Sequence, residues 1–266
     1  MWDYKECCRG MILKKIVLAC DLDNTIIHSY KTRNDGDICI EYIHGKEQGY
    51  MHPDTYKDIP ELASHINIIP VTTRSIEQYI RLKWPDQWHP EYAITTNGAI
   101  FLHNTDVDDE WSRNSKEMVC NCMLEMNSLM EQLLKDEDYI RCRMVDDMYL
   151  FCYCKDGIEA SEKTKQYSNV TGLKVEWSGK KIYFFPPMIN KGSAISRLKN
   201  RLKCDYIISV GDSFIDIPML NKADFALCKK KVYDLVENNK KVEYNEERSF
   251  SWNIWRAINS LNQSSN

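Results

Sequence analysis

The stretch Lys15-Ile-Val-Leu-Ala-Cys-Asp-Leu-Asp-Asn-Thr25 joins an apolar run to two closely spaced acids. Residues 16–20 are continuously apolar, which is typical of a strand that is buried on both faces of a parallel sheet. Asp21 and Asp23 follow this strand directly. Since side chains two residues apart on an extended backbone point the same way, we expect both carboxylates to face one pocket at the end of the strand.

Other segments repeat this order of strand, polar turn and helix. Residues 66–71, Ile-Asn-Ile-Ile-Pro-Val, form a second apolar run, and Ser75 to Gln78 is a capping box at the start of a helix. Further strands are predicted at 92–95, 206–210 and 224–228, and a helix at 192–203. Strands that alternate with helices predict an α/β fold, a Rossmann-like parallel sheet whose ligands bind at the carboxyl ends of the strands.

The middle of the chain follows another pattern. One helical stripe is predicted from six apolar positions: Val119, Cys122, Met123, Met126, Met130 and Leu133. A hairpin at 139–154, a helix near 158–167 and a second hairpin at 173–185 follow it. This α-β-β-α-β-β order predicts an α+β cap at 101–183, inserted into a core made of 1–100 and 184–266. We interpret the Met and Cys stripe as core packing rather than a cofactor site.

The composition of the 266 residues excludes several classes of protein. Hydrophobic residues make up 43% and charged residues 28%, with 10 Gly and 8 Pro, which excludes a mainly disordered or collagen-like chain. The formal net charge of −4 lacks the basic excess that binding to a phosphate backbone requires, so no nucleic-acid partner is expected. Because no apolar run approaches the roughly 18 residues of a membrane span, we expect no membrane association and a soluble, cytoplasmic protein.

The 11 cysteines are expected to be reduced thiols, because their number is odd and we expect no export signal. The closest pairs in the sequence are Cys7/Cys8, Cys120/Cys122 and Cys152/Cys154. Structural zinc sites usually need two CxxC-like pairs or added His, so packed cysteines are favoured and zinc binding stays the alternative. Metal binding by His28, His44 and His52, which lie in a polar segment, is a weaker alternative.

A second acidic pair follows the predicted strand at 206–210, in the segment Gly211-Asp212-Ser-Phe-Ile-Asp216. If this strand neighbours the first one, four acids meet at one edge of the sheet. They would repel one another unless a cation or protons neutralised them, and oxygen ligands at this density suit Mg²⁺. Taken singly, each Asp has an ordinary interpretation as a helix cap or a turn residue.

Two further residues complete a predicted phosphate site. Thr72 supplies a hydroxyl at a strand end, and Lys191 supplies a cation where a helix begins at Gly192-Ser193. Ammonium groups and helix N-termini both attract phosphate. Alone, Thr72 would be a helix-flanking residue and Lys191 a surface charge, and only their order along the chain with the acids favours a site.

In that order, the residues resemble the motifs of the haloacid dehalogenase (HAD) superfamily of phosphatases and phosphotransferases. The DxDxT motif of the superfamily matches Asp21, Asp23 and Thr25, and its GDxxxD motif matches Asp212 and Asp216. A lone DxDxT would be a weak match, but four motifs in the right order at strand ends are specific.

The remaining motifs are similar to those of the Cof-type subgroup, which carries an α/β cap between its second and third motifs. Thr72-Thr73-Arg74 stands for the TGR of that subgroup, Lys191 matches its third motif, and Asn97-Gly98-Ala99 is similar to the NGA segment before its cap. The sequence departs from the pattern at Thr73, where Gly is usual, at Asn24, and at 213–215. We expect these departures to affect substrate preference more than the reaction.

The resemblance implies a role for each matching residue. Asp21 would attack phosphorus to give an aspartyl-phosphate, and Asp23 would serve as general acid and base. Mg²⁺ would be held by the Asp21 carboxylate, the Asp23 backbone carbonyl and Asp212, with Asp216 as a further ligand or an orienting acid. The phosphate-binding residues implied are Thr72, Thr73, Lys191 and Asn97.

These roles imply a Mg²⁺-dependent hydrolase of a small phosphorylated metabolite, and a sugar phosphate is the favoured substrate. A phosphotransferase of the phosphohexomutase type and a catalytically silent HAD-fold binding protein are the alternatives. The oligomeric state is left open.

The cap is expected to choose the substrate, because it closes over the leaving group while the core holds the phosphate. Trp177 and Tyr183 would either stack on a sugar ring or pack. Four cap cations would either meet a second anionic group or lie on solvated strand faces, and the second interpretation is favoured: Arg141, Arg143, Lys180 and Lys181.

Overall fold

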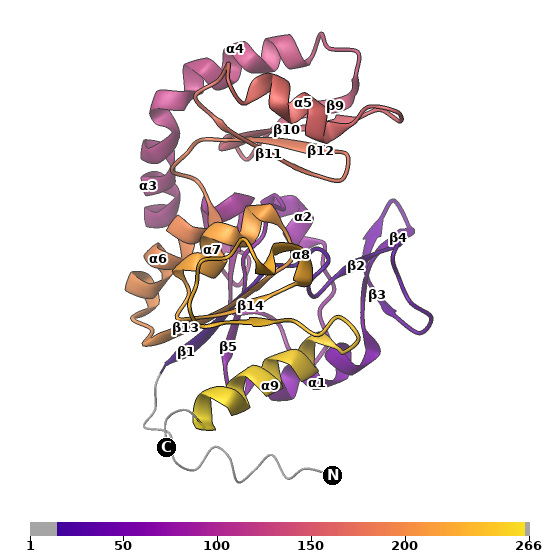
Figure 1. The fold of residues 1–266 in the computed structure, drawn as a ribbon, viewed down its shortest axis with the longest axis vertical. Coiled ribbons are helices and arrows are strands. Elements are labelled where there is room, and N and C mark those ends of the chain that lie inside the picture. The colour runs from indigo at the N-terminus through magenta and orange to yellow at the C-terminus, as the bar shows by residue number, and fades with distance from the viewer. Residues whose placement is uncertain (1–14, 264–266) are drawn as a thin grey trace.

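A five-stranded sheet forms the centre of the core (Figure 1). The computed structural model describes residues 15–263. The strands of this sheet are β1 (Ile16–Cys20), β5 (Asn67–Pro70), β13 (Tyr206–Gly211), β14 (Phe225–Cys228) and β15 (Lys241–Glu243). They lie in the order β15-β14-β13-β1-β5, and every neighbouring pair is parallel. The predicted α/β core with a parallel sheet is confirmed.

Helices cover both faces of this sheet. The largest of them are α1 (Pro53–Ala63), α6 (Lys191–Leu202), α7 (Ile217–Lys222) and α9 (Phe250–Gln263). Leu18 and Cys20 of β1 belong to the hydrophobic cluster that includes α1 and α9, whereas Val17 and Ala19 belong to the cluster that includes α6 and α7. Figure 1 shows these two pairs of helices on opposite sides of the strands. Burial on both faces explains why this strand is apolar at every position.

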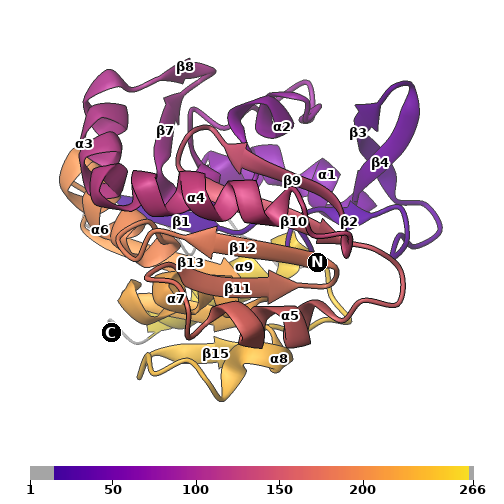
Figure 2. The same cartoon turned by 90° about the horizontal axis from the view of Figure 1, so that it is seen from above.

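The middle of the chain forms a second unit above the core. Its elements are α3 (Asp109–Val119), α4 (Met123–Leu133), β9 (Tyr139–Val145), β10 (Tyr149–Cys154), α5 (Ala160–Tyr167), β11 (Lys174–Ser178) and β12 (Lys181–Phe185). The four strands pair antiparallel in the order β11-β12-β10-β9. Figures 1 and 2 show α4 and α5 on the side of this sheet that faces away from the core. The predicted α+β cap and its element order are confirmed.

Two expected helices are shorter than their apolar patterns suggested. The stripe from Val119 to Leu133 is broken by a 3-10 turn, η2 (Cys120–Cys122), where Cys-Asn-Cys has low helix propensity. Ile76, Ile80 and Trp84 have the spacing of one helical face, which predicts a helix that reaches Trp84. Helix α2 (Ile76–Ile80) begins at the predicted capping box but ends before Trp84, and Ile80 is 47% exposed. The stripe residues still pack in the cap as predicted, since Met126 and Leu133 are buried.

Two small antiparallel sheets were not predicted. One contains β2 (His28–Ser29), β4 (Lys46–Met51) and β3 (Ile38–Ile43), and the other contains β6 (Tyr92–Thr95), β7 (Ile100–His103) and β8 (Asp106–Val107). A parallel bridge between Val71 and Ile94 connects β6 to the end of β5. Strand β7 therefore pairs with a core strand although most of it lies beyond residue 100, and β8 pairs with β7. The domain limits at 101 and 183 stay a prediction.

The remaining described helix is α8 (Lys230–Tyr233), which follows β14. Between residues 15 and 263, no helix has both the length and the apolar composition that crossing a bilayer would require.

Candidate active site

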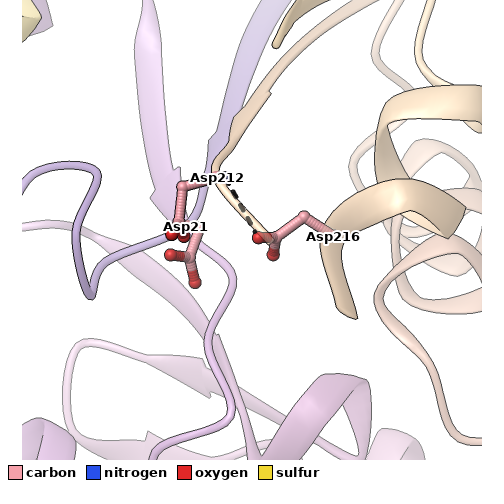
Figure 3. A group of neighbouring side chains, drawn as sticks. All are labelled: Asp21, Asp212 and Asp216. Carbon is pink, nitrogen blue, oxygen red and sulfur yellow. Dashed lines mark hydrogen bonds between the residues drawn. The ribbon is translucent and has the colours of Figure 1, made fainter. Parts of the chain in front are cut away.

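The register of β1 and β13 brings the two acidic motifs together. Cys20 pairs with Val210, and the amide of Asp21 donates to the carbonyl of Val210 at 3.0 Å. Each strand ends within one residue of this point, so Asp21 and Asp212 leave the sheet side by side (Figure 3). Carboxylate oxygens of Asp21, Asp212 and Asp216 all lie within 4.8 Å of one another. The convergence of these three predicted acids is thus a property of the parallel sheet.

Lys191 is the cation at the centre of this cluster. Its Nζ donates to Asp21 Oδ1 and to Asp216 Oδ1, at 2.5 Å each, and the residue is only 1% exposed. Burial alone would lower the pKa of a lysine, but the carboxylates of Asp21 and Asp216 outweigh it and raise the pKa of Lys191. Lys191 is therefore a permanent charge that is held in place by two acids, rather than a mobile surface lysine.

The carboxylate of Asp216 accepts hydrogen bonds from the loop that carries Asp212. Its Oδ2 accepts from the amide of Asp212 at 3.2 Å, the amide of Ser213 at 2.9 Å and the Ser213 hydroxyl at 2.7 Å. Its Oδ1 accepts from Lys191, and the residue is fully buried. Both oxygens thus have protein donors, so the geometry favours Asp216 as an acid that orients Asp212 and Lys191 over one that binds an ion directly.

The cluster holds more negative charge than one lysine can neutralise. Burial and the carboxylate of Asp216 raise the pKa of Asp21 well above its usual range, although Lys191 opposes this. Burial and Asp216 likewise raise the pKa of Asp212 to about 6. An unbalanced set of buried carboxylate oxygens is the chemistry that a hard divalent cation such as Mg²⁺ satisfies. The donor set therefore fits the predicted cofactor, with Asp21 and Asp212 as the carboxylates that would hold it.

Asp23 has a different partner. Arg74 forms two hydrogen bonds with it, from Nε to Oδ2 at 3.0 Å and from Nη2 to Oδ1 at 2.7 Å, and its Nη1 lies 2.9 Å from Glu41. Burial would raise the pKa of Asp23, but Arg74, with help from Lys181 and Lys191, lowers it well below the usual range. In this state Asp23 is an anion, so action as a general acid requires this ion pair to loosen.

Thr72 and Thr73 follow the end of β5, the strand that pairs with β1. Thr72 is fully buried, and its hydroxyl accepts from the amide of Arg74 at 3.1 Å. The carbonyl of Thr73 accepts from the hydroxyl of Tyr149 in the cap at 2.5 Å. Thr72 thus stabilises the turn that places Arg74. Thr73 is the residue of the second motif that contacts Tyr149 of the cap.

Asn97 is buried in a turn next to the loop that precedes Lys191. Its Nδ2 donates to the carbonyl of Ile189 at 3.2 Å, and only 1% of the residue is exposed. Thr96, Asn97 and Gly98 all have φ between 55° and 105°, a left-handed run that favours Asn and Gly. This geometry ties the NGA segment to the Lys191 loop. The Oδ1 atom of Asn97 is buried without a hydrogen-bond partner among the described residues, and phosphate binding by Asn97 stays a prediction.

The turn between β9 and β10 supplies cap contacts that the sequence did not suggest. Asp146 accepts hydrogen bonds from the amide of Ile76 at 3.1 Å and from the hydroxyl of Thr96 at 2.5 Å. Together with Tyr149, it fixes one end of the cap sheet against the core. No local motif marks Asp146 or Tyr149. Arg74 could have been found, since it stands in the Thr-Thr-Arg that resembles the second motif.

Two of the histidines considered as metal ligands have partners within the protein. His28 lies 3.0 Å from Asp37, and His52 caps α1, accepting from the amide of Asp54 at 3.1 Å. Of the His, Cys, Asp and Glu side chains from 15 to 263, the acidic cluster is the group close enough to hold an ion. The nine described cysteines are free thiols, and Cys7 and Cys8 lie outside the described residues.

Gly211 lies beside the acidic cluster at a position with no room for a side chain. A Cβ there would lie 2.5 Å from Cβ and 2.8 Å from Cγ of Asp216. We expect Gly211→Ala to displace Asp216, lower the free energy of unfolding by roughly 1–3 kcal/mol and reduce turnover. Thermal unfolding and initial rates of the variant and the wild type check this. Wild-type stability in Gly211→Ala would contradict the close packing.

Comparison with known proteins adds a family and a fold. A family model described as haloacid dehalogenase-like hydrolase matches residues 92–242. The sequence comparison with curated proteins gives no match.

Three solved structures illustrate the likeness of fold. The sucrose-phosphatase of Synechocystis sp. PCC6803, solved with sucrose and phosphate, has a TM-score of 0.63 at 15% identity, covering 92% of this chain and 97% of its own. The phosphatase BT1666 of Bacteroides thetaiotaomicron has a TM-score of 0.56 at 16% identity, covering 95% and 97%. The HAD subclass IIB sugar phosphatase BT4131 has a TM-score of 0.55 at 15% identity, covering 92% and 99%. At these identities the likeness establishes the fold alone.

Proposed function

Because this chain belongs to the haloacid dehalogenase-like hydrolases, we propose that it is a phosphatase that hydrolyses a small phosphomonoester, with Mg²⁺ as cofactor and a sugar phosphate as the favoured substrate. One observation carries the proposal. Lys191 bridges Asp21 and Asp216 beside Asp212, at the carboxyl edge of the parallel sheet. Sugar phosphatases among the structures of the same fold support the choice of substrate class.

In the proposed reaction, a carboxylate oxygen of Asp21 attacks phosphorus in line. The Asp21–phosphorus bond forms as the bond to the leaving oxygen breaks, and Asp23 donates a proton to that oxygen. Water then attacks the aspartyl-phosphate while Asp23 removes a proton from the water, which releases phosphate and restores Asp21. The charge of Lys181 on the cap acts on Asp23 in the core, so the leaving group is expected to lie between the core and the cap.

The surrounding residues position the reactants. The hydroxyl of Thr25 donates to Asp21 Oδ2 at 3.4 Å, and Lys191 holds Oδ1, so the nucleophile has a fixed orientation. Lys191 also places a positive charge where the transferred phosphoryl oxygens gather. Asp21, Asp212 and the Asp23 backbone carbonyl are proposed to hold Mg²⁺, which when bound offsets the repulsion between the nucleophile and the phosphate.

The direct test measures phosphate release from a panel of sugar phosphates, nucleotides and other phosphomonoesters, with Mg²⁺ and with a chelator. We expect continuous release from at least one sugar phosphate that stops when the chelator is added. Release limited to one burst per enzyme would instead favour the phosphohexomutase alternative. Absence of release from every ester would favour a silent binding protein.

Ion binding is expected to depend on pH in a defined direction. The raised pKa of Asp212 means that the folded state favours its protonated form. When no ion is bound, the contribution of Asp212 to stability is therefore present below about pH 4 and is lost as the pH rises through about 6. Mg²⁺ must displace that proton. We therefore expect Mg²⁺ to raise the melting temperature more at pH 7 than at pH 5, and Asp212→Asn to abolish this difference. A shift that does not vary with pH would contradict binding at Asp212.

A further inference from the structure

We propose that the substrate carries a second anionic group on its leaving group, a carboxylate or a second phosphate, which Lys181 and Arg143 of the cap bind. This inference rests on the proposed function, because it names the substrate class of the same site. It begins from the face of the cap sheet that is turned towards the core (Figure 1).

The strand register decides which side chains share that face. Lys181 is opposite Tyr153, Tyr183 is opposite Phe151, and Phe151 is in turn opposite Arg143. Directly opposed residues of an antiparallel pair point to the same side. Phe151 and Tyr183 belong to the hydrophobic cluster that includes core residues, so this side faces the core.

The other side of the sheet is accounted for by packing. The alternate residues of the same strands, such as Cys152 and Ile182, point to the opposite side of the sheet. They belong to the hydrophobic cluster that includes α4 and α5. Trp177 packs with that cluster too, which makes it a packing residue rather than a platform for a sugar ring. The cations on the core-facing side are therefore set apart from the helical layer of the cap.

The side chain of Arg143 packs on an aromatic ring and has one buried donor without an acceptor. Its guanidinium lies 5.6 Å from the centre of the Phe151 ring, within the range of a cation–π interaction. Its Nε is buried and has no hydrogen-bond partner among the described residues. A buried guanidinium nitrogen without an acceptor is costly, and an anion that reached it would remove this cost.

Lys181 is the second cation on this face, and its charge acts on the proposed acid–base residue. Its ammonium is one of the charges that act on Asp23, the residue proposed to protonate the leaving oxygen. The side chain is exposed, and no carboxylate of the described residues forms an ion pair with it. Arg74 already neutralises Asp23 through two hydrogen bonds, so the charge of Lys181 is not needed to balance that acid.

The acids of the cap sheet do not balance these cations. Glu176 is the one acid within its four strands, and it pairs with Lys174 at 2.7 Å. Lys180, next to Lys181 in the chain, pairs with Asp156 at the surface. The cap thus presents unpaired positive charge above the leaving-group side of the site, which complements an anionic leaving group and not a neutral sugar.

The experiment compares substrates that differ by one anionic group. Glucose 6-phosphate has a neutral leaving group, 6-phosphogluconate adds a carboxylate, and glucose 1,6-bisphosphate adds a phosphate. We expect kcat/KM for at least one doubly anionic ester to exceed that for glucose 6-phosphate by roughly 10-fold or more. Lys181→Met and Arg143→Met are expected to cut this preference by roughly 10- to 100-fold, mainly through KM. Lys180→Met, the matched control, keeps the preference of the wild type.

Calorimetry supplies a readout that does not depend on turnover. Asp21→Asn is titrated with the same three compounds, alone and combined with Lys181→Met. Tighter binding of a doubly anionic compound, lost in the double variant, supports the inference. Equal binding of all three compounds overturns it, as does a loss that Lys181→Met causes equally for every substrate. Failure of the proposed function would appear separately, as absence of phosphate release from every ester of the panel.

Discussion

Asp21→Asn is expected to abolish turnover while the protein stays folded. The variant keeps the size and shape of the side chain but removes the nucleophilic oxygen, and loss of a nucleophile typically costs at least about 10⁴-fold in kcat. Rates of phosphate release in Mg²⁺ measure the effect. Asp86→Asn, which changes an exposed carboxylate, is the control for the substitution itself.

The same variant is expected to be more stable than the wild type when no ion is bound. Burial and the neighbouring carboxylates hold the pKa of Asp21 above its usual range, so its charge opposes folding at neutral pH. Replacing it with a neutral amide removes that repulsion, and thermal unfolding in chelator should show a higher melting temperature. If Asp21→Asn retained more than about 1% of turnover, covalent catalysis by this residue would be wrong.

Arg74→Met is expected to produce the largest loss of stability among the variants considered. The guanidinium is shared by Asp23 and Glu41, and the side chain of Glu41 is only 6% exposed. Removing one partner of a buried ion pair costs about 3–5 kcal/mol. Arg81 still lies 3.2 Å from Glu41, and Asp23 is 39% exposed, so we expect a value at the lower end, about 3 kcal/mol.

The pH dependence of this loss identifies its cause. The pKa of Asp23 is lowered in the folded state, so its contribution to stability is present above about pH 4 and disappears as the pH falls below that value. Denaturant unfolding should therefore show a larger difference between Arg74→Met and the wild type at pH 7 than at pH 3. Glu41→Gln in the Arg74→Met background should restore part of the stability. A difference independent of pH would show that lost packing, not charge, is the cause.

Much of this fold can be predicted from short stretches of sequence. Residues 16–20 are apolar at every position because both faces of β1 are covered, and that requirement acts on each residue separately. The order of the cap elements was also predictable from local signals, because each hairpin and each helix has its own hydrophobic periodicity. The broken helix at Cys120–Cys122 and the sheet of β2, β3 and β4 were missed, because irregular polar segments carry weaker periodic signals.

The candidate site was predictable to the extent that it is built from strand ends. Asp21 and Asp212 meet because β1 and β13 are neighbouring parallel strands, and each acid comes directly after its apolar run. The environment of each group was not predictable. Asn97 and Thr72 stand in the expected motifs, but their hydrogen bonds go to the loop before Lys191 and to the Arg74 turn.

The sequence by itself determined the parallel core, the inserted cap and the residue types that carry charge at the ends of the strands. Only the tertiary structure decided which charges pair: Arg74 with Asp23 and Glu41, Lys191 with Asp21 and Asp216, and Lys181 and Arg143 with no carboxylate of the described residues. The physical reason is that hydrophobic periodicity is local, whereas an ion pair depends on the distance between side chains far apart in the chain and on how deeply they are buried.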